Sequence, residues 1–285
     1  MRPVALALFA LALALFAPTL AATGAGAHET WLEPGLDVGS QPQAGVRTPG
    51  VGDVIVADIR HGERFQGRSV RFRARNVRRL EVHAPSRVHR LRPAPGARPA
   101  VRFTATEAGL HVVVHVSAVL RTSYTAPDQF ERFVREYDLR ANGRDPMART
   151  RALPNVFSEA YTRHNKALVP VLSSTVPDRT IGLALEIVMD EVRTLRPRGR
   201  VLFDGRPAGN VLVRVFSRPA FDAAAPAKVR DVRTDGEGRF AVAVRPLDRV
   251  LLSTVHLREP DPALALARDV AWETLWATTT FVAPQ

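Results

Sequence analysis

The chain of 285 residues contains no cysteine, and it has only three methionines, three tryptophans and three tyrosines. The absence of cysteine excludes disulfide frameworks, zinc fingers, iron–sulfur sites and thiol nucleophiles. Lysine is equally scarce, because Lys166 and Lys228 are the only two among the 40 basic residues and the rest are arginines. Any transition metal held by this chain is therefore expected to have nitrogen and oxygen ligands.

Motifs of the common catalytic sites are also missing. The sequence has no G-x-S-x-G elbow, no phosphate loop, no dinucleotide fingerprint and no H-E-x-x-H. Neighbouring carboxylates such as Glu131 and Glu136 are interspersed with Arg132 and Arg135, which is typical of a solvated helix face. We predict that the protein is not an enzyme. A copper oxygenase built on an N-terminal histidine stays open as an alternative, and it would need a second imidazole and a flat substrate face.

An apolar segment opens the chain. Met1-Arg2 gives a positive start, Val4 to Leu20 is almost wholly apolar, and Ala25-Gly-Ala27 supplies the small residues of a cleavage site. We predict a signal peptide over residues 1–27, with His28 as the first residue of a periplasmic or secreted protein. A membrane anchor is the alternative, but a run of about 17 apolar residues is short for a span. No second long apolar run occurs, so no transmembrane segment is expected in the mature chain.

The formal net charge is +12. A basic balance raises affinity for phosphates, yet arginines such as Arg71, Arg73 and Arg75 are scattered at alternate positions rather than gathered on one helix. Together with export, this pattern predicts no nucleic-acid partner. The same positive charge disfavours the approach of bare metal cations.

Residues 28–125 have the pattern of a β-sandwich, with short strands between turns rich in proline and glycine. Hydrophobic and polar residues alternate over Val70 to Ala74, which predicts a strand there. In the run from His111 to Ser117 the valines at even positions share one face. His111 and His115 share the other face, and we expect both to be half-exposed.

Residues 126–181 are predicted to form a helical and loop connection. Phe130, Phe133, Val134 and Tyr137 follow helical spacing and predict a short amphipathic helix whose aromatic stripe packs in the core. The stretch from Phe157 to Leu172 is ambiguous, and strand is favoured from Ala167 onward.

Residues 182–285 predict a second β-sandwich. Alternating segments are separated by hairpin signals at Asp204-Gly205 and within Thr234 to Arg239. The fold class expected for the whole chain is therefore mainly β, with two immunoglobulin-like or transthyretin-like modules and a short helical excursion between them.

Several short motifs follow one another along the chain. They are H-E-T-W-L-E-P from His28, G-E-R-F-Q-G from Gly62, the pair Val255-His256, and W-E-T-L-W-A from Trp272. That order resembles a NikM-like family of exported bacterial proteins of unknown function that is associated with nickel and cobalt uptake. The second module separately resembles carboxypeptidase-regulatory domains. The resemblance implies a β-rich periplasmic protein that binds a transition metal (nickel, cobalt or copper) and supports its uptake by a membrane metal transporter.

The candidate metal ligands are His28, His256 and His61. After cleavage, the free amine and Nδ1 of His28 can chelate one divalent metal, and imidazole suits nickel, copper and zinc. Val255-His256 belongs to the family-like motifs, and His61 precedes the turn at Gly62. Glu29 or Glu273 is a possible oxygen ligand. Cleavage elsewhere in the leader would abolish the chelate.

A second hypothesis involves no metal. Trp31, Trp272 and Trp276 could form a stacking platform for sugar, which would make the protein a structural or carbohydrate-interacting module of the cell envelope. Tryptophans at such positions are more often part of a hydrophobic core, and core packing is the favoured interpretation.

Overall fold

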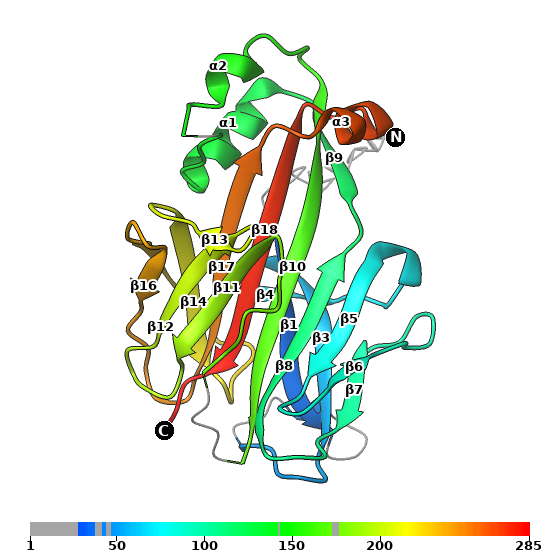
Figure 1. The fold of residues 1–285 in the computed structure, drawn as a ribbon, viewed down its shortest axis with the longest axis vertical. Helices are drawn as coiled ribbons and strands as arrows, with labels where there is room; N and C mark the ends of the chain where they lie inside the picture. Colours follow the sequence, from blue (N-terminus) through cyan, green and yellow to red (C-terminus); the bar gives the residue numbers. More distant parts are fainter. Residues whose placement is uncertain (1–27, 38–41, 44–46, 142, 173–176) are drawn as a thin grey trace, which may run out of the picture.

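The computed structural model describes residues 28–285 except 38–41, 44–46, 142 and 173–176. The predicted signal peptide, residues 1–27, lies outside the described residues. The described part is mainly β, as predicted, and its strands form three sheets (Figure 1).

The central layer is a nine-stranded sheet with the order β15-β14-β17-β18-β10-β8-β5-β6, and β9 pairs with β10 beside this path. Its strands come from both halves of the sequence: β5 (Val77–His83), β6 (Val88–Arg90), β8 (Gly109–Ser117), β9 (Leu120–Tyr124), β10 (Phe157–Val171), β14 (Leu212–Pro219), β15 (Lys228–Arg233), β17 (Asp248–Arg258) and β18 (Trp272–Val282). The parallel pair β10–β18 joins the two halves. The two predicted sandwiches therefore share one sheet.

A smaller sheet covers each face of this central layer. The five-stranded sheet contains β1 (Glu29–Asp37), β2 (Pro42–Gln43), β3 (Val54–Glu63), β4 (Gln66–Ser69) and β7 (Val101–Thr104). The four-stranded sheet contains β11 (Leu185–Glu191), β12 (Arg198–Phe203), β13 (Arg206–Pro207) and β16 (Arg239–Ala241). Alternation along β8 explains how one sheet serves two cores, because Val112 and Val114 pack toward the four-stranded sheet and Val113 packs toward the five-stranded one.

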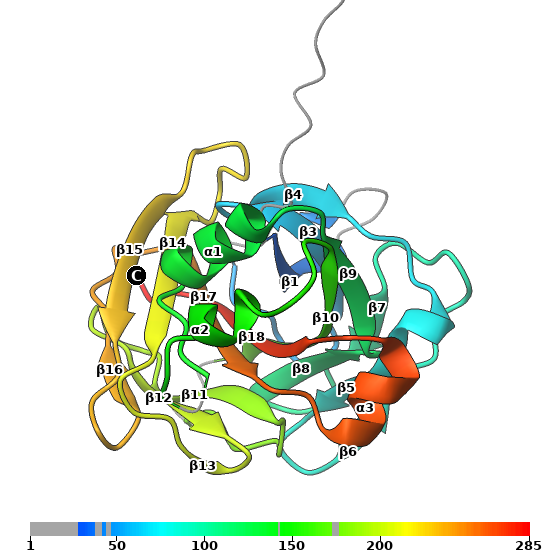
Figure 2. The ribbon, with the colours of Figure 1, turned by 90° about the horizontal axis from the view of Figure 1, so that it is seen from above.

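Helices gather at one end of the long strands. The predicted amphipathic helix is confirmed as α1 (Pro127–Glu136), and its aromatic stripe packs on Trp272 and Trp276 of β18. The view from above shows α1 and the short helix α2 (Met147–Thr150) over the ends of β17 and β18 (Figure 2). The other helical segments are α3 (Pro262–Arg268) and the 3-10 turn η1 (Ala74–Asn76).

A buried ion-pair cluster ties the central sheet to the four-stranded sheet. Lys166 of β10 is 1% exposed, and its Nζ lies 2.6 Å from Asp178 Oδ2 and 3.1 Å from Glu186 Oε1. The same ammonium donates to the carbonyl oxygens of Arg179 and Ile187. This ion cluster contains one of the two lysines of the chain.

One local prediction is wrong, and another is confirmed only in part. Val70 to Ala74 is not a strand, because β4 ends at Ser69 and only Phe72 of this segment is buried, held by single backbone bonds to Ala97 and Gly96. The stretch from Phe157, which was ambiguous between helix and strand, forms β10, a strand of 15 residues in the middle of the largest sheet. The strand favoured from Ala167 is therefore confirmed, and it begins ten residues earlier than expected.

The hairpin at Asp204-Gly205 is confirmed. Both residues have positive φ, 48° and 75°, as a tight turn between two antiparallel strands requires, and they connect β12 to β13. Glycine adopts this conformation without strain, and aspartate tolerates it better than most residues.

Candidate metal centre

His28 and His61 lie next to each other at the edge of the five-stranded sheet. β1 and β3 are antiparallel, with Glu29 opposite Gly62 and Thr30 opposite His61, and His28 directly precedes β1. The two imidazole rings have centroids 5.2 Å apart and planes at 68°. Two of the three candidate ligands are therefore brought together by strand pairing.

Each ring has a nitrogen in a defined setting. His61 Nδ1 lies 3.1 Å from Thr30 Oγ1, and when Nδ1 donates to that hydroxyl, Nε2 carries the lone pair that binds a metal. His28 Nδ1 lies 3.0 Å from Glu63 Oε1 without the geometry of a hydrogen bond, and it has no hydrogen-bond partner in the described part of the chain. The His28 side chain is 37% exposed, although its Nδ1 atom is buried.

The charge state of His61 suits metal binding. Burial lowers the pKa of His61 to about 4, and the nearby positive charges of Arg163 and His28 act in the same direction. His61 is therefore neutral at neutral pH, which is the form of imidazole that coordinates a metal.

His256 is not near this pair. On β17, Val255 and Leu257 pack toward α1, so His256 points to the opposite face of the central sheet. There its ring stacks on Phe203 with centroids 3.9 Å apart. The pairing of strands separates His256 from His28 and His61, and the proposal below does not include it.

The two expected oxygen ligands have other partners. Glu29 is buried and accepts a hydrogen bond of 2.7 Å from the hydroxyl of Tyr137. Glu273 forms a two-point ion pair with Arg258, at 2.8 and 3.1 Å. Glu63 is the carboxylate that lies beside His28, and the sequence analysis missed it because its position depends on the β1–β3 register.

Among the residues that the structure describes, no group of three or more His, Cys, Asp or Glu side chains is arranged to hold a metal ion. A site at His28 and His61 therefore depends on a third nitrogen, and the α-amine of His28 would supply it if the chain is cleaved after Ala27.

A hollow of about 450 Å³ lies beside the pair. Its lining mixes acidic and basic side chains with two apolar ones: Glu29, Glu63, Arg64, Glu136, Arg214, Phe216, Val229, Arg230 and Asp231. This surface is concave and charged, unlike the flat face that a polysaccharide oxygenase would need.

The expectation of half-exposed histidines on β8 is wrong. His111 is 1% and His115 is 4% exposed, because β8 is a central strand covered on both faces. His115 Nδ1 pairs with the amide nitrogen of Asn165 at 2.8 Å, and burial lowers its pKa to about 4.

The tryptophans pack in the core, as favoured from the sequence. Trp31, Trp272 and Trp276 are at most 2% exposed. Trp276 stacks on Phe133 with ring centroids 5.6 Å apart, and Trp272 donates its indole N–H to Thr150. None of the three presents a face for stacking a sugar.

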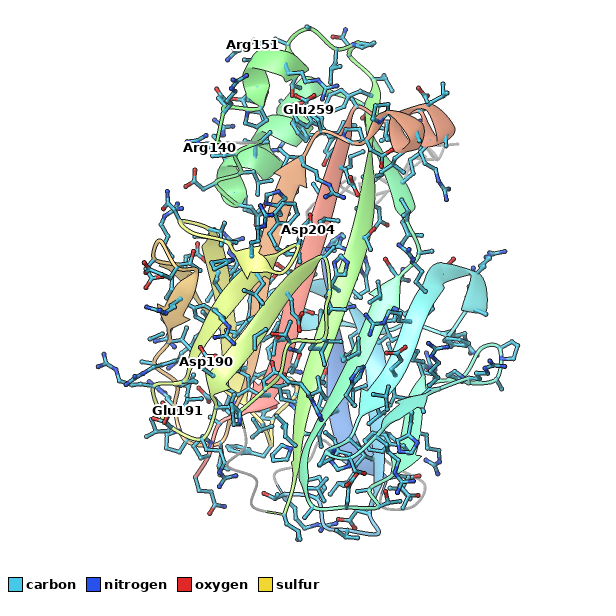
Figure 3. The ribbon with its side chains drawn as sticks, viewed as in Figure 1. Arg140, Arg151, Asp190, Glu191, Asp204 and Glu259 are labelled. Carbon is cyan, nitrogen blue, oxygen red and sulfur yellow. The ribbon has the colours of Figure 1, made fainter. Side chains whose placement is uncertain are left out.

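Several exposed charged side chains lie beside a charge of opposite sign, as Arg140 does beside Asp138. Arg140 and Arg151 near the helices, and Asp190 and Glu191 at the end of β11, lie at the periphery of the molecule (Figure 3). Asp190 is 3.3 Å from Arg200. Helices long and apolar enough to span a membrane are absent from the described residues.

The fold and these residues define a mainly β protein of several sheets with few helices. The chain belongs to a family described as a domain of unknown function, DUF4198, whose model matches residues 25–258. No curated protein matches the chain in sequence. Among solved structures, dimeric latent PorU from Porphyromonas gingivalis matches 88% of this chain at 10% identity with a TM-score of 0.19, and the chain covers 20% of that protein.

Proposed function

We propose that this protein is an exported metal-binding accessory that holds a transition metal and passes it to a membrane metal transporter. The proposed ligands are the α-amine and Nδ1 of His28 and the imidazole of His61. The observation that carries the proposal is the contact between these two rings, 5.2 Å apart, with His28 Nδ1 lacking a hydrogen-bond partner among the described residues.

Three nitrogen donors, with Glu63 as an additional oxygen donor, suit Cu(II), Ni(II) or Co(II). The intrinsic order of affinities favours copper, so the metal bound in the cell depends on supply as well as on this site. A site at the first residue of a mature chain, on a side chain that is 37% exposed, would suit transfer to a partner.

In this proposal, removal of the leader during export frees the α-amine of His28, which is the third ligand. Mass spectrometry tests whether the leader is removed at that position. The full chain is expressed with its leader in a bacterial host, recovered from the periplasm, and its first residue and metal content are measured. The proposal predicts His28 as the first residue and about one bound divalent metal per chain after loading. A different first residue, or a chain that starts at His28 and binds no metal, would overturn it.

A copper oxygenase is a second candidate, because His61 supplies the second imidazole that such a site requires. The charged hollow beside the pair is less suited to a polysaccharide surface. Copper-loaded protein, reductant and oxygen distinguish the two: an accessory protein yields no oxidised product, whereas an oxygenase does.

A further inference from the structure

A cavity of about 400 Å³ lies at the end of the long strands that is opposite the helices. It is lined at the points where β1, β10 and β18 end and by the loop at residues 47–49 (Figure 1). Pro34 in this lining follows His28 by six positions along β1, which is about 20 Å at the usual rise of a strand. The cavity is therefore separate from the histidine pair and from the hollow beside it.

Most of the cavity wall is apolar. The side chains of Leu36, Leu168, Leu247 and Val282 contribute to it, together with several prolines. The volume equals that of roughly a dozen water molecules at about 30 Å³ each, so an organic ligand of about a dozen non-hydrogen atoms has room there. Ligand sites in proteins commonly combine such an apolar wall with a few charged or polar groups that orient the ligand.

The charged side chains of the lining are all arginines. They are Arg47, Arg193 and Arg249, and none of the described lining residues carries a carboxylate side chain. Arg47 is held by Asp53, with Nη1 2.9 Å from the carboxylate oxygen Oδ2. Arg193 is exposed, whereas Arg249 is 2% exposed. The cavity is therefore apolar and positively charged, which favours a ligand that is an anion with an apolar body.

The positive charge of Arg249 is only partly compensated. The carboxylate of Glu33 lies 2.6 Å from Arg218 and 3.0 Å from Arg60. The Nε atom of Arg249 is farther from it, at 3.8 Å, and Nη1 donates to the carbonyl oxygen of Pro34 at 2.9 Å. Burial lowers the pKa of Arg249, and the attraction of Glu33 opposes this effect only in part. Because three guanidiniums share one carboxylate, an additional negative charge beside Arg249 would be stabilised.

We propose that this cavity binds a small amphipathic carboxylate, with its apolar body between the ends of β1, β10 and β18 and its carboxylate toward Arg249 and Arg193. A planar carboxylate accepts the in-plane N–H groups of a guanidinium. A doubly charged phosphate would lose more hydration on entering a mostly apolar cavity. The ligand class is thus an alkyl or aryl carboxylate of about a dozen non-hydrogen atoms. This site does not depend on the metal site at His28 and His61.

The test titrates decanoate into the protein in a calorimeter, below the concentration at which decanoate forms micelles. We expect Arg249→Met and Arg193→Met each to weaken decanoate binding by about tenfold or more, because each removes a charged hydrogen-bond donor. Arg193→Met changes an exposed residue, so it tests the site even if Arg249→Met does not fold. The matched control is Arg196→Met, at an exposed arginine of the same loop that lies outside this cavity, and it is expected to bind as the wild type does.

Three further probes separate the apolar and ionic parts of the interaction. Acetate has the carboxylate without the alkyl chain, and it is expected to bind about 100-fold or more weakly than decanoate. Inorganic phosphate and decyltrimethylammonium, which has the chain with a positive charge, are also expected to bind more weakly. Absence of decanoate binding, equal binding by the wild type and Arg193→Met, or binding of any of the three probes as tight as that of decanoate would overturn the inference. None of these results bears on copper binding at His28, which is measured separately.

Discussion

The imidazole rings of His28 and His61 meet edge to face, with centroids 5.2 Å apart, although 33 positions separate them in the sequence. The antiparallel register of β1 and β3 produces this contact by placing Thr30 opposite His61. His61 lies within this strand pair and His28 directly precedes it, so the register of the two strands brings the two residues together. Such a pair needs only one more donor to chelate a divalent metal.

His61, which lies next to His28, and His256, which lies on the opposite face of the central sheet, give a matched pair of variants. His61→Ala removes a ligand and is expected to weaken Cu(II) binding by about 100-fold, or about 2.7 kcal/mol. His256→Ala removes a ring that stacks on Phe203 on the opposite face of the central sheet, and it is expected to leave metal affinity unchanged. Competition titration with a chromophoric chelator measures both. Equal losses in the two variants would contradict the assignment.

Because Glu159 is buried, we expect the difference in stability between the wild type and Glu159→Gln to depend on pH. Burial raises its pKa from the ordinary 4.5 to about 7, so the folded chain holds a proton that the unfolded chain releases between these values. The contribution of this group to the free energy of unfolding is therefore lost as the pH rises through about 7. Glu159→Gln does not titrate, and its stability relative to wild type is expected to rise by on the order of 2 kcal/mol between about pH 5 and about pH 8.

Urea unfolding at both pH values gives this difference directly. His61, His115 and His164, whose pKa values burial lowers to about 4, have the opposite pH dependence. They are present in both proteins and cancel in the comparison. A stability difference that is the same at both pH values would show that Glu159 is ionised throughout.

Replacing each of the two lysines of the chain is expected to change the free energy of unfolding by very different amounts. Lys166→Met leaves the buried carboxyls of Asp178 and Glu186 without their cation, and it is expected to destabilise the protein by about 3–5 kcal/mol. Lys228→Met changes an exposed residue of β15 and is expected to cost less than about 0.5 kcal/mol. Thermal unfolding of both variants tests the pair. Similar Tm values would mean that the buried ion cluster adds no net stability.

The sequence predicted elements whose hydrophobic pattern is local. Helix α1 follows from its aromatic stripe, and the β12–β13 hairpin follows from Asp204-Gly205, because three to ten neighbouring residues determine each. The first part of strand β10, residues 157–166, was ambiguous for a physical reason, whereas the strand favoured from Ala167 is confirmed. This first part carries buried polar residues such as Asn165 and Lys166, whose partners lie on other strands, so no alternation of apolar residues marks it.

The candidate site, like the fold, could be predicted only in part from the sequence. His28 was nominated from the predicted leader and its predicted cleavage site, and His61 could be nominated but not placed. Alternation along a strand shows that Val255 and His256 point to opposite faces, but it does not say which face meets β1. Glu63 became identifiable only when the strand register was known, because nothing in its local sequence distinguishes it from other charged residues.

The measurement that tests the central claim most directly is Cu(II) titration of two proteins that differ only at the α-amine of His28. In the first this amine is free, and in the second it is acetylated, which converts it into an amide without adding a new amine. The account predicts that acetylation weakens binding by about 100-fold or more, because the chelate of amine and Nδ1 is lost. Equal affinity of the two proteins would contradict it.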